Sequence, residues 1–384
     1  MSEWKKVPLD KMGVISRGKS KHRPRNDARL FGGKYPFIQT GDIGAAGLYV
    51  QNYSQTYNEE GLAQSKLWAK DTLCITIAAN IADTALLAFP ACFPDSIMGF
   101  VPYKNVSNVK YVKYCFDILK KDCQQISQGT AQDNLSWKKL STILFPCPPI
   151  EVQNRIAEIL SRYDSLIENY QKQIKLLEEA AQRLYKEWFV DLHFPSHENT
   201  KIVDGVPEGW EKKCVDSIYS IKYGKNLSTK LITADGDYPV YGANGVIGYY
   251  DKANCNEQVV LITSRGNGSG DVLMTYHKDS FITNNSFIVI PLNEYDYCQL
   301  PFTYQFLKNA NFRSVRTGAA QPQLTNQSIH TVNVVLPHKE LIVEYCKRTL
   351  KSNDVIIHLR NQIRLLTEAR DRLLPKLMSG EIAV

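Results

Sequence analysis

Residues 174–180 read IKLLEEA and residues 363–369 read IRLLTEA, so one short stretch of the chain recurs 189 positions later. Both copies place an isoleucine and a leucine three positions apart, on one face of a predicted α-helix. A second match keeps the same distance, because GTAQDNLS at 129–136 recurs as GAAQPQLT at 318–325. Two matches in one order and at one offset indicate an internal repeat.

The repeat also reaches the front of each half of the chain. Trp4 corresponds to Trp210, and the pair Gly-Lys at 18–19 corresponds to Gly-Lys at 224–225, both at an offset of 206. Because the offset drifts only by loop-sized steps, we predict two copies of one unit, each a mixed domain followed by a long helix. The predicted segments are a first domain at 1–149, a central helix at 150–192, a linker at 193–208, a second domain at 209–338 and a C-terminal helix at 339–384.

The two predicted helices carry apolar residues at alternating steps of four and three, which is typical of a coiled-coil seam. The residues expected to pack along this seam are Ile156, Leu160, Tyr163, Ile167, Tyr170, Ile174, Leu177 and Leu184 in the first helix, and Ile356, Leu359, Ile363, Leu366 and Leu373 in the second. Arg370 interrupts the second seam. At 1.5 Å per residue, the first helix would be about 50 Å long. We expect the helices to pack on each other as a rigid spacer; the alternative is two separate partner-binding helices.

Short apolar runs in front of each helix predict β-strands. Residues 73–78 and 85–89 correspond to residues 260–263 and 272–276 at an offset of 187. In the second copy, RGNGSG at 265–270 has the composition of a turn between two strands. The predicted fold class is α+β, with two pseudo-repeated mixed α/β domains separated by two long antiparallel coiled-coil helices.

The composition is that of a globular protein. The 384 residues carry a formal net charge of +7, with 43% hydrophobic and 22% charged residues. The first residues form no apolar signal segment, and no membrane span is expected. The nine cysteines contain no CxxC pair, which favours a reduced, cytoplasmic protein. The excess charge is local, because residues 17–29 hold six Lys or Arg residues against one Asp.

Some motifs resemble catalytic sites without the context that such sites need. GVISRGKS at 13–20 satisfies the P-loop pattern, but no apolar strand precedes it and Pro24 stands where a helix should follow. His193 and His197 are separated by Pro195, so they are not expected to bind a metal together. No methyltransferase tetrapeptide or nuclease carboxylate cluster is present. We therefore predict a non-catalytic chain that holds no cofactor or metal of its own.

Two similar domains at a fixed separation suit a protein that reads a bipartite DNA site. Lys and Arg side chains would hold phosphates, whereas Gln, Asn and Arg side chains pair with base edges. The candidate DNA-binding residues in the first domain are Lys19, Lys21, Arg23, Arg25, Gln128, Thr130, Gln132 and Asn134. Those in the second are Lys222, Lys225, Arg265, Arg313, Arg316, Gln321 and Gln323. Each of them could instead be a loop residue that satisfies backbone groups.

Two further stretches carry a family resemblance. PPIEVQNRIAEIL at 148–160 resembles the central helical region of the specificity subunits of type I restriction-modification systems. LLPKLMSGEI at 373–382 is similar to the C-terminal end of the same subunits. The start of the second helix, LPHKE at 336–340, departs from the Pro-Pro start of the first.

This resemblance implies a role in phage defence. Each domain would be a target recognition domain that reads one half of an asymmetric site in double-stranded DNA, and the helices would set the spacer between the halves. The helices would also dock two methyltransferase (modification) subunits that carry S-adenosylmethionine. Restriction subunits with ATP- and Mg-dependent translocation would join them.

Two alternatives remain open at the level of the sequence. A stand-alone, repressor-like protein would use the same two domains to bind a bipartite operator without modification partners. A P-loop nucleotide enzyme would need Lys19 to bind a phosphate of the nucleotide.

Overall fold

The computed structural model describes residues 4–127, 135–318 and 321–384, and these residues divide into two compact units. The first unit comprises Met1–Tyr170 and Ile363–Val384, and the second comprises Gln171–Gln362. Each unit therefore contains a part of both long helices.

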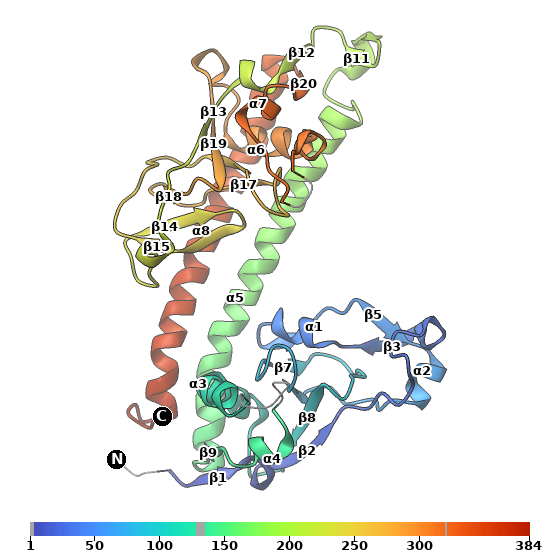
Figure 1. The fold of residues 1–384 in the computed structure, drawn as a ribbon, viewed down its shortest axis with the longest axis vertical. Helices are drawn as coiled ribbons and strands as arrows, with labels where there is room; N and C mark the ends of the chain where they lie inside the picture. Colours follow the sequence, from blue (N-terminus) through green and yellow to red (C-terminus); the bar gives the residue numbers. More distant parts are fainter. Residues whose placement is uncertain (1–3, 128–134, 319–320) are drawn as a thin grey trace. The chain divides into compact units, whose positions relative to one another are not determined.

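The first unit is built on a five-stranded sheet with the strand order β2-β8-β6-β7-β4 (Figure 1). Its strands are β2 Gly13–Arg17, β4 Tyr49–Val50, β6 Leu73–Thr76, β7 Thr84–Leu87 and β8 Ile97–Pro102. Every residue of β6 and β7 is buried, as expected for short apolar runs at the centre of a sheet. The predicted strand, turn and strand at 73–89 are confirmed.

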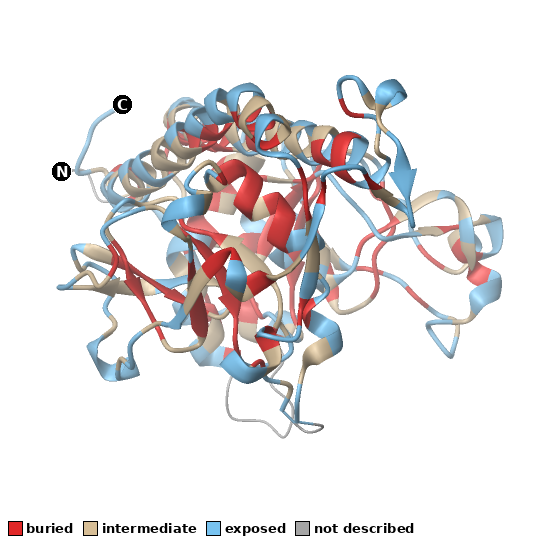
Figure 2. Ribbon diagram, turned by 90° about the horizontal axis from the view of Figure 1, so that it is seen from above, coloured by how far each residue is buried: buried red, intermediate tan, exposed pale blue. Residues whose placement is uncertain are grey.

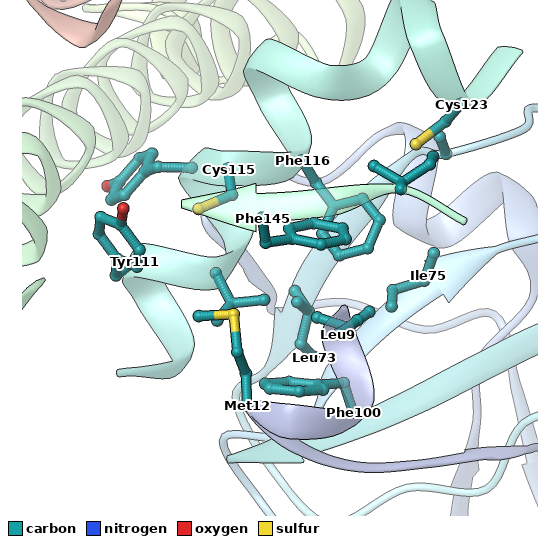
Figure 3. Packing of buried hydrophobic residues seen from close by; sticks show 14 of the residues in the cluster. Leu9, Met12, Leu73, Ile75, Phe100, Tyr111, Cys115, Phe116, Cys123 and Phe145 are labelled. Carbon is teal, nitrogen blue, oxygen red and sulfur yellow. The ribbon is translucent and has the colours of Figure 1, made fainter. Parts of the chain in front are cut away.

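Smaller elements surround this sheet. The remaining strands are β1 Lys6–Pro8 paired with β9 Leu144–Pro146, and β3 Phe31–Phe37 paired with β5 Gln55–Tyr57. The helices are α1 Thr40–Gly44, α2 Glu59–Ala63, α3 Val109–Ser127 and α4 Trp137–Leu140. Figure 3 shows Phe116 of α3 lying against Phe145 of β9, with Leu73 and Phe100 of the main sheet close by. The same core includes residues of both long helices, Ile156 and Leu377 among them.

The second unit repeats this plan. Its four-stranded sheet has the order β13-β19-β16-β17, which matches β2-β8-β6-β7 of the first unit strand for strand. These strands are β13 Tyr219–Tyr223, β16 Val260–Thr263, β17 Val272–Met274 and β19 Ser286–Pro291. The pair β12 Glu211–Cys214 and β20 Asn333–Leu336 repeats the pair β1 and β9. The internal repeat predicted from the sequence is therefore a repeat of three-dimensional structure.

The second unit also has a three-stranded sheet, which contains β14 Tyr238–Gly242, β15 Gly245–Tyr250 and β18 Phe281–Ile282. Its short helices are α6 Leu300–Asn309 and α7 Asn326–Ile329, and α7 repeats α4 at the offset of 189. The predicted linker contains a small hairpin, β10 Ile202–Val203 and β11 Val206–Pro207. Asp204 and Gly205 both adopt positive φ angles, +51° and +74°, which suits a two-residue turn.

The two long helices are α5 Ile150–Tyr185, with 36 residues, and α8 Lys339–Met378, with 40 residues. A π-helical turn at Lys186–Val190 follows α5. Every seam residue selected from the sequence is buried or half-buried. Figure 2 shows buried positions along the strands and on part of each helix, while the remaining helix surface is exposed. No helix among the described residues is both long and apolar enough to cross a membrane.

Candidate nucleic-acid interface

The repeated Gly-Lys pair lies directly after the first strand of each main sheet. A Cβ atom on Gly18 would lie 2.3 Å from the carbonyl oxygen of Pro94, and one on Gly224 would lie 2.3 Å from that of Thr283. Since real Cβ atoms do not come so close to an oxygen, both positions require glycine. The lysine that follows is exposed in both units. The Gly-Lys pair thus repeats because of the packing of the turn.

This geometry contradicts the P-loop alternative. Residues 13–17, which open the P-loop pattern, form strand β2, whereas a P-loop wraps a phosphate after its strand. The elements that follow Lys19 are a short 3₁₀ turn at Ala28–Leu30 and strand β3, so no helix N-terminus faces Gly18 and Lys19. The pattern GxxxxGK[ST] is met here by chance.

A chain of backbone hydrogen bonds joins three loops of the second unit. The N–H of Asn284 donates to the carbonyl oxygen of Lys225 at 3.0 Å, and the N–H of Ser264 donates to that of Asn285 at 2.8 Å. The N–H of Leu324 then donates to the carbonyl oxygen of Ser264 at 2.8 Å. These bonds bring Lys225, the loop that starts at Arg265, and the segment around Gln323 to one edge of the unit. We call this edge the loop edge.

The first unit has the same loop edge. The N–H of Lys19 donates to the carbonyl oxygen of Phe93 at 3.1 Å, as that of Lys225 donates to Ile282 at 2.9 Å. The next two bonds also have counterparts, since Ile77 donates to Ser96 at 3.0 Å and Leu135 donates to Ile77 at 2.9 Å. The predicted candidates Gln128, Thr130, Gln132 and Asn134 lie just before Leu135, outside the residues that the structure describes.

The basic run of the first unit is exposed beside its loop edge. Lys19 and Lys21 make no ion pair among the described residues. Arg23 lies 3.5 Å from Asp95, which also pairs with Arg25. Such surface pairs are weak, so the Arg25 guanidinium remains available for a phosphate, whereas the Arg23 Nη1 also donates to the carbonyl oxygens of Ser20 and His22.

Arg29, next to this run, is held by a different carboxylate. Its guanidinium donates to both oxygens of Asp27, at 3.1 and 2.7 Å. Hydrogen bonds from Arg29, joined by one from His22, hold the pKa of the Asp27 carboxyl below its usual range. Asp27 therefore stays negatively charged and neutralises part of the basic run.

Four further candidates of the second unit are exposed on or near the loop edge. Arg265 and Gln323 are exposed, pair with each other through a β-bridge and lie on the loop edge. Gln321, two residues before Gln323, is also exposed. Lys222 is exposed on strand β13, before the loop edge begins.

Arg313 is an ion-pair partner within the fold. Its Nε and Nη2 atoms donate to one oxygen of Asp271 at 3.2 and 2.5 Å. In the first unit Asp83, in the corresponding loop, also has a cationic partner, since the Lys120 Nζ lies 2.6 Å from it, but Lys120 belongs to α3 and Arg313 follows α6. Arg313 therefore has a partner within the fold, and its contact with DNA stays a prediction.

Arg316 behaves differently from Arg313. Its Nε and Nη2 atoms are buried and have no hydrogen-bond partner among the described residues. Buried donors are normally paired, so an unpaired guanidinium is unusual. Arg316 therefore has donor atoms that no acceptor among the described residues satisfies.

Sequence analysis did not select two asparagines that the structure places at the loop edge of the second unit. Asn267 is exposed between two glycines of the turn at 265–270, and Asn244 is exposed at the tip of the β14–β15 hairpin. The two turns are in contact, since a Cβ atom on Gly268 would lie 3.2 Å from the Asn244 Oδ1. An asparagine flanked by glycines in a loop was the available signal; the stretch indicated a turn whose backbone could face a ligand, and the asparagine itself was not selected.

Comparisons with known proteins agree with this repeated architecture. The family described as type I restriction modification DNA specificity domain matches residues 1–179 and again residues 207–365. The type I restriction enzyme MjaIX specificity subunit of Methanocaldococcus jannaschii is 25% identical over 414 aligned residues, which cover all of this chain and 94% of the relative. The EcoprrI specificity subunit of Escherichia coli is 22% identical, with 88% and 84% of the two chains covered.

A solved structure shares the fold. The crystal structure of the type I restriction-modification S subunit from M. genitalium matches with a TM-score of 0.62 at 19% sequence identity. The match covers 97% of this chain and 96% of the other. The likeness therefore extends over both units.

Proposed function

Because the chain belongs to the type I restriction-modification DNA specificity family, we propose that it is the DNA-recognition subunit of a type I restriction-modification complex. The observation that carries the proposal is the loop edge, which the same backbone hydrogen bonds build in both units. Two equivalent edges in one chain are what a bipartite site requires, one for each half-site.

The side chains of the two loop edges have two proposed roles, contact with phosphates and contact with bases. Lys19, Lys21 and Lys225 are placed to contact phosphates, which gives affinity and salt dependence without sequence preference. Arg265, Asn267 and Gln323 carry the guanidinium and amide groups that pair with guanine and adenine edges in the major groove. The buried, unpaired donors of Arg316 support a further contact to DNA.

The long helices are proposed to set the spacer between the half-sites. Helix α5 contributes residues to both units, as does α8. With 36 residues, α5 is about 54 Å long at 1.5 Å per residue. One turn of B-DNA is about 34 Å, so a helix of this length can hold two half-sites about one turn apart.

The remaining parts of the proposal concern the partners. The helices would dock two methyltransferase subunits, and restriction subunits would join the complex. In this proposal, S-adenosylmethionine, ATP and Mg act on those partners, and the chain itself is a non-catalytic, cytoplasmic subunit. The support is the family membership of the whole chain, together with the exposed leucines Leu166, Leu176 and Leu365 on the two helices.

Methylation mapping tests the proposed function. Genomic DNA would be sequenced for modified bases from cells that express this chain with its neighbouring methyltransferase, and from cells that lack the chain. We expect one bipartite motif with a fixed gap, present only with the chain. An unchanged methylation pattern would contradict the proposal. If the chain binds a DNA operator but captures no methyltransferase in a pull-down, a stand-alone repressor would be favoured.

A further inference from the structure

Arg370 interrupts the apolar seam of α8, and within the first unit it meets a buried carboxylate. Its Nη1 atom donates to the Asp164 Oδ1 at 2.6 Å, across from α8 to α5. Asp164 is only 6% exposed, and the Arg370 side chain is 27% exposed. The break in the heptad pattern therefore corresponds to an ion pair that links the two long helices.

The recognition domain joins the same pair. Tyr114, on α3, donates its hydroxyl to the other oxygen of Asp164 at 2.5 Å. Tyr114 is 1% exposed, so the bond is shielded from water. Asp164, Arg370 and Tyr114, which we call the junction triad, thus connect α5, α8 and the first domain at one point.

The interactions of the junction triad favour one register of the two long helices and one placement of the first domain on them. Without Arg370, the buried carboxylate of Asp164 would be left uncompensated, which is strongly unfavourable, whereas Arg370 also donates to Asp371, the next residue on α8. A polar group at a single seam position of paired helices fixes their register, because any shift along the seam separates it from its partner. The hydroxyl of Tyr114 extends that constraint from the helices to the recognition domain.

The second unit does not repeat the junction triad, although it has its own ion pair between the long helices, from Arg360 on α8 to Glu178 on α5 at 2.8 Å. At the repeat offset of 189, Asn353 stands in the place of Asp164 and Ala181 in the place of Arg370. There, the hydroxyl of Tyr345 on α8 donates to the backbone carbonyl of Ala181 on α5 at 3.0 Å. The junction triad is therefore a property of the first unit and does not follow from the repeat.

We propose that the junction triad is a positioning element that fixes the first recognition domain on the helix pair, and so fixes the spacer length at which the first half-site is accepted. This inference rests on the proposed function. None of the three side chains lies on the loop edge, so the triad acts on DNA only through the placement of the domain. Its loss should change tolerance for spacer length and leave the sequence of both half-sites unchanged.

The test uses the full complex of this chain with its methyltransferase. Methylation rates would be measured on duplexes with the native spacer and with one base pair more or fewer. The first variant is Asp164→Asn, which removes the buried charge. The second is Tyr114→Phe, which removes only one hydroxyl and keeps the test valid if Asp164→Asn does not fold. Arg372→Ala is the matched control, since it breaks an exposed pair with Glu368 on the same helix.

For Asp164→Asn we expect the preference for the native spacer to fall at least about threefold, the scale of coupling changes caused by mutations between sites. Tyr114→Phe should cause a smaller change in the same direction, and Arg372→Ala none. An equal loss of rate on all three spacers, or an unchanged preference in folded Tyr114→Phe and Asp164→Asn, would overturn the inference. If the wild-type complex methylates no bipartite site, the proposed function itself fails; if it does so with a spacer preference that neither Asp164→Asn nor Tyr114→Phe changes, the inference alone fails.

Discussion

The two recognition domains share a frame but differ in the side chains that the frame presents. The first domain places a dense basic run at 17–29 beside its loop edge, whereas the equivalent stretch of the second, at 223–235, holds only Lys225 and Lys230 as basic residues. The second domain instead presents a glycine-rich turn with Arg265 and Asn267. The backbone hydrogen bonds are therefore the repeated part of the two domains, whereas the exposed side chains differ between the domains that read the two half-sites.

The strongest test of the shared frame is to fill the space at its glycines. Gly18→Ala and Gly224→Ala should each destabilise the protein by about 2 kcal/mol, since the added methyl group would overlap a backbone carbonyl. Urea unfolding measures the loss. Gly41→Ala is the control, because nothing lies within 4 Å of its Cβ position, and it should leave stability unchanged or slightly higher. A small effect at only one of Gly18 and Gly224 would show that the frames are not equivalent.

The next largest effect is expected for residues of the second domain that are proposed to contact bases. Arg265→Ala and Asn267→Ala should each cost about 1–3 kcal/mol of binding to the cognate site and relax preference at one base of one half-site. Binding measured on a panel of duplexes with single substitutions in either half-site reports both effects. Arg313→Ala is the matched comparison, because Arg313 is engaged with Asp271. A loss that is uniform over all duplexes would reassign Arg265 or Asn267 to phosphate contact.

Salt dependence should then distinguish the basic run from the second domain. Lys19→Ala and Lys21→Ala should each lower the slope of log affinity against log salt by about 1 and weaken all sequences alike. Lys225→Ala should have the same effect if the two edges bind phosphates equivalently. An unchanged slope for Lys225→Ala, with a changed slope for Lys19→Ala, would make phosphate binding a property of the first domain.

The smallest expected effect concerns the surface ion pair of Arg25. Arg25→Ala should change the free energy of unfolding by less than about 1 kcal/mol, because both Arg25 and Asp95 are well exposed. Thermal unfolding measures this change, and DNA binding by the same variant shows whether Arg25 also contacts a phosphate. A large loss of stability would mean that the pair with Asp95 holds the basic run in place.

Sequence patterns predicted those parts of the fold that depend on local spacing. The seam of α5 and the strands at 73–76 and 260–263 follow from residues within a few positions of one another. The ion pair of Arg313 was not predicted, because its partner Asp271 lies 42 positions away. Arg370 was visible as a fault in the seam, but its buried partner Asp164, 206 positions away, was not.

The first unit is formed by two separate stretches of sequence, Met1–Tyr170 and Ile363–Val384, and this affects the order in which the two units can fold. Its core includes Leu377 and Met378 beside Ile156 and Leu160, and Leu377 and Met378 are synthesised only after all of the second unit. The second unit, Gln171–Gln362, is contiguous and can complete its core earlier. Domains that fold as units during synthesis normally do so from the N-terminus. Here the domain that is synthesised first is the last to be finished.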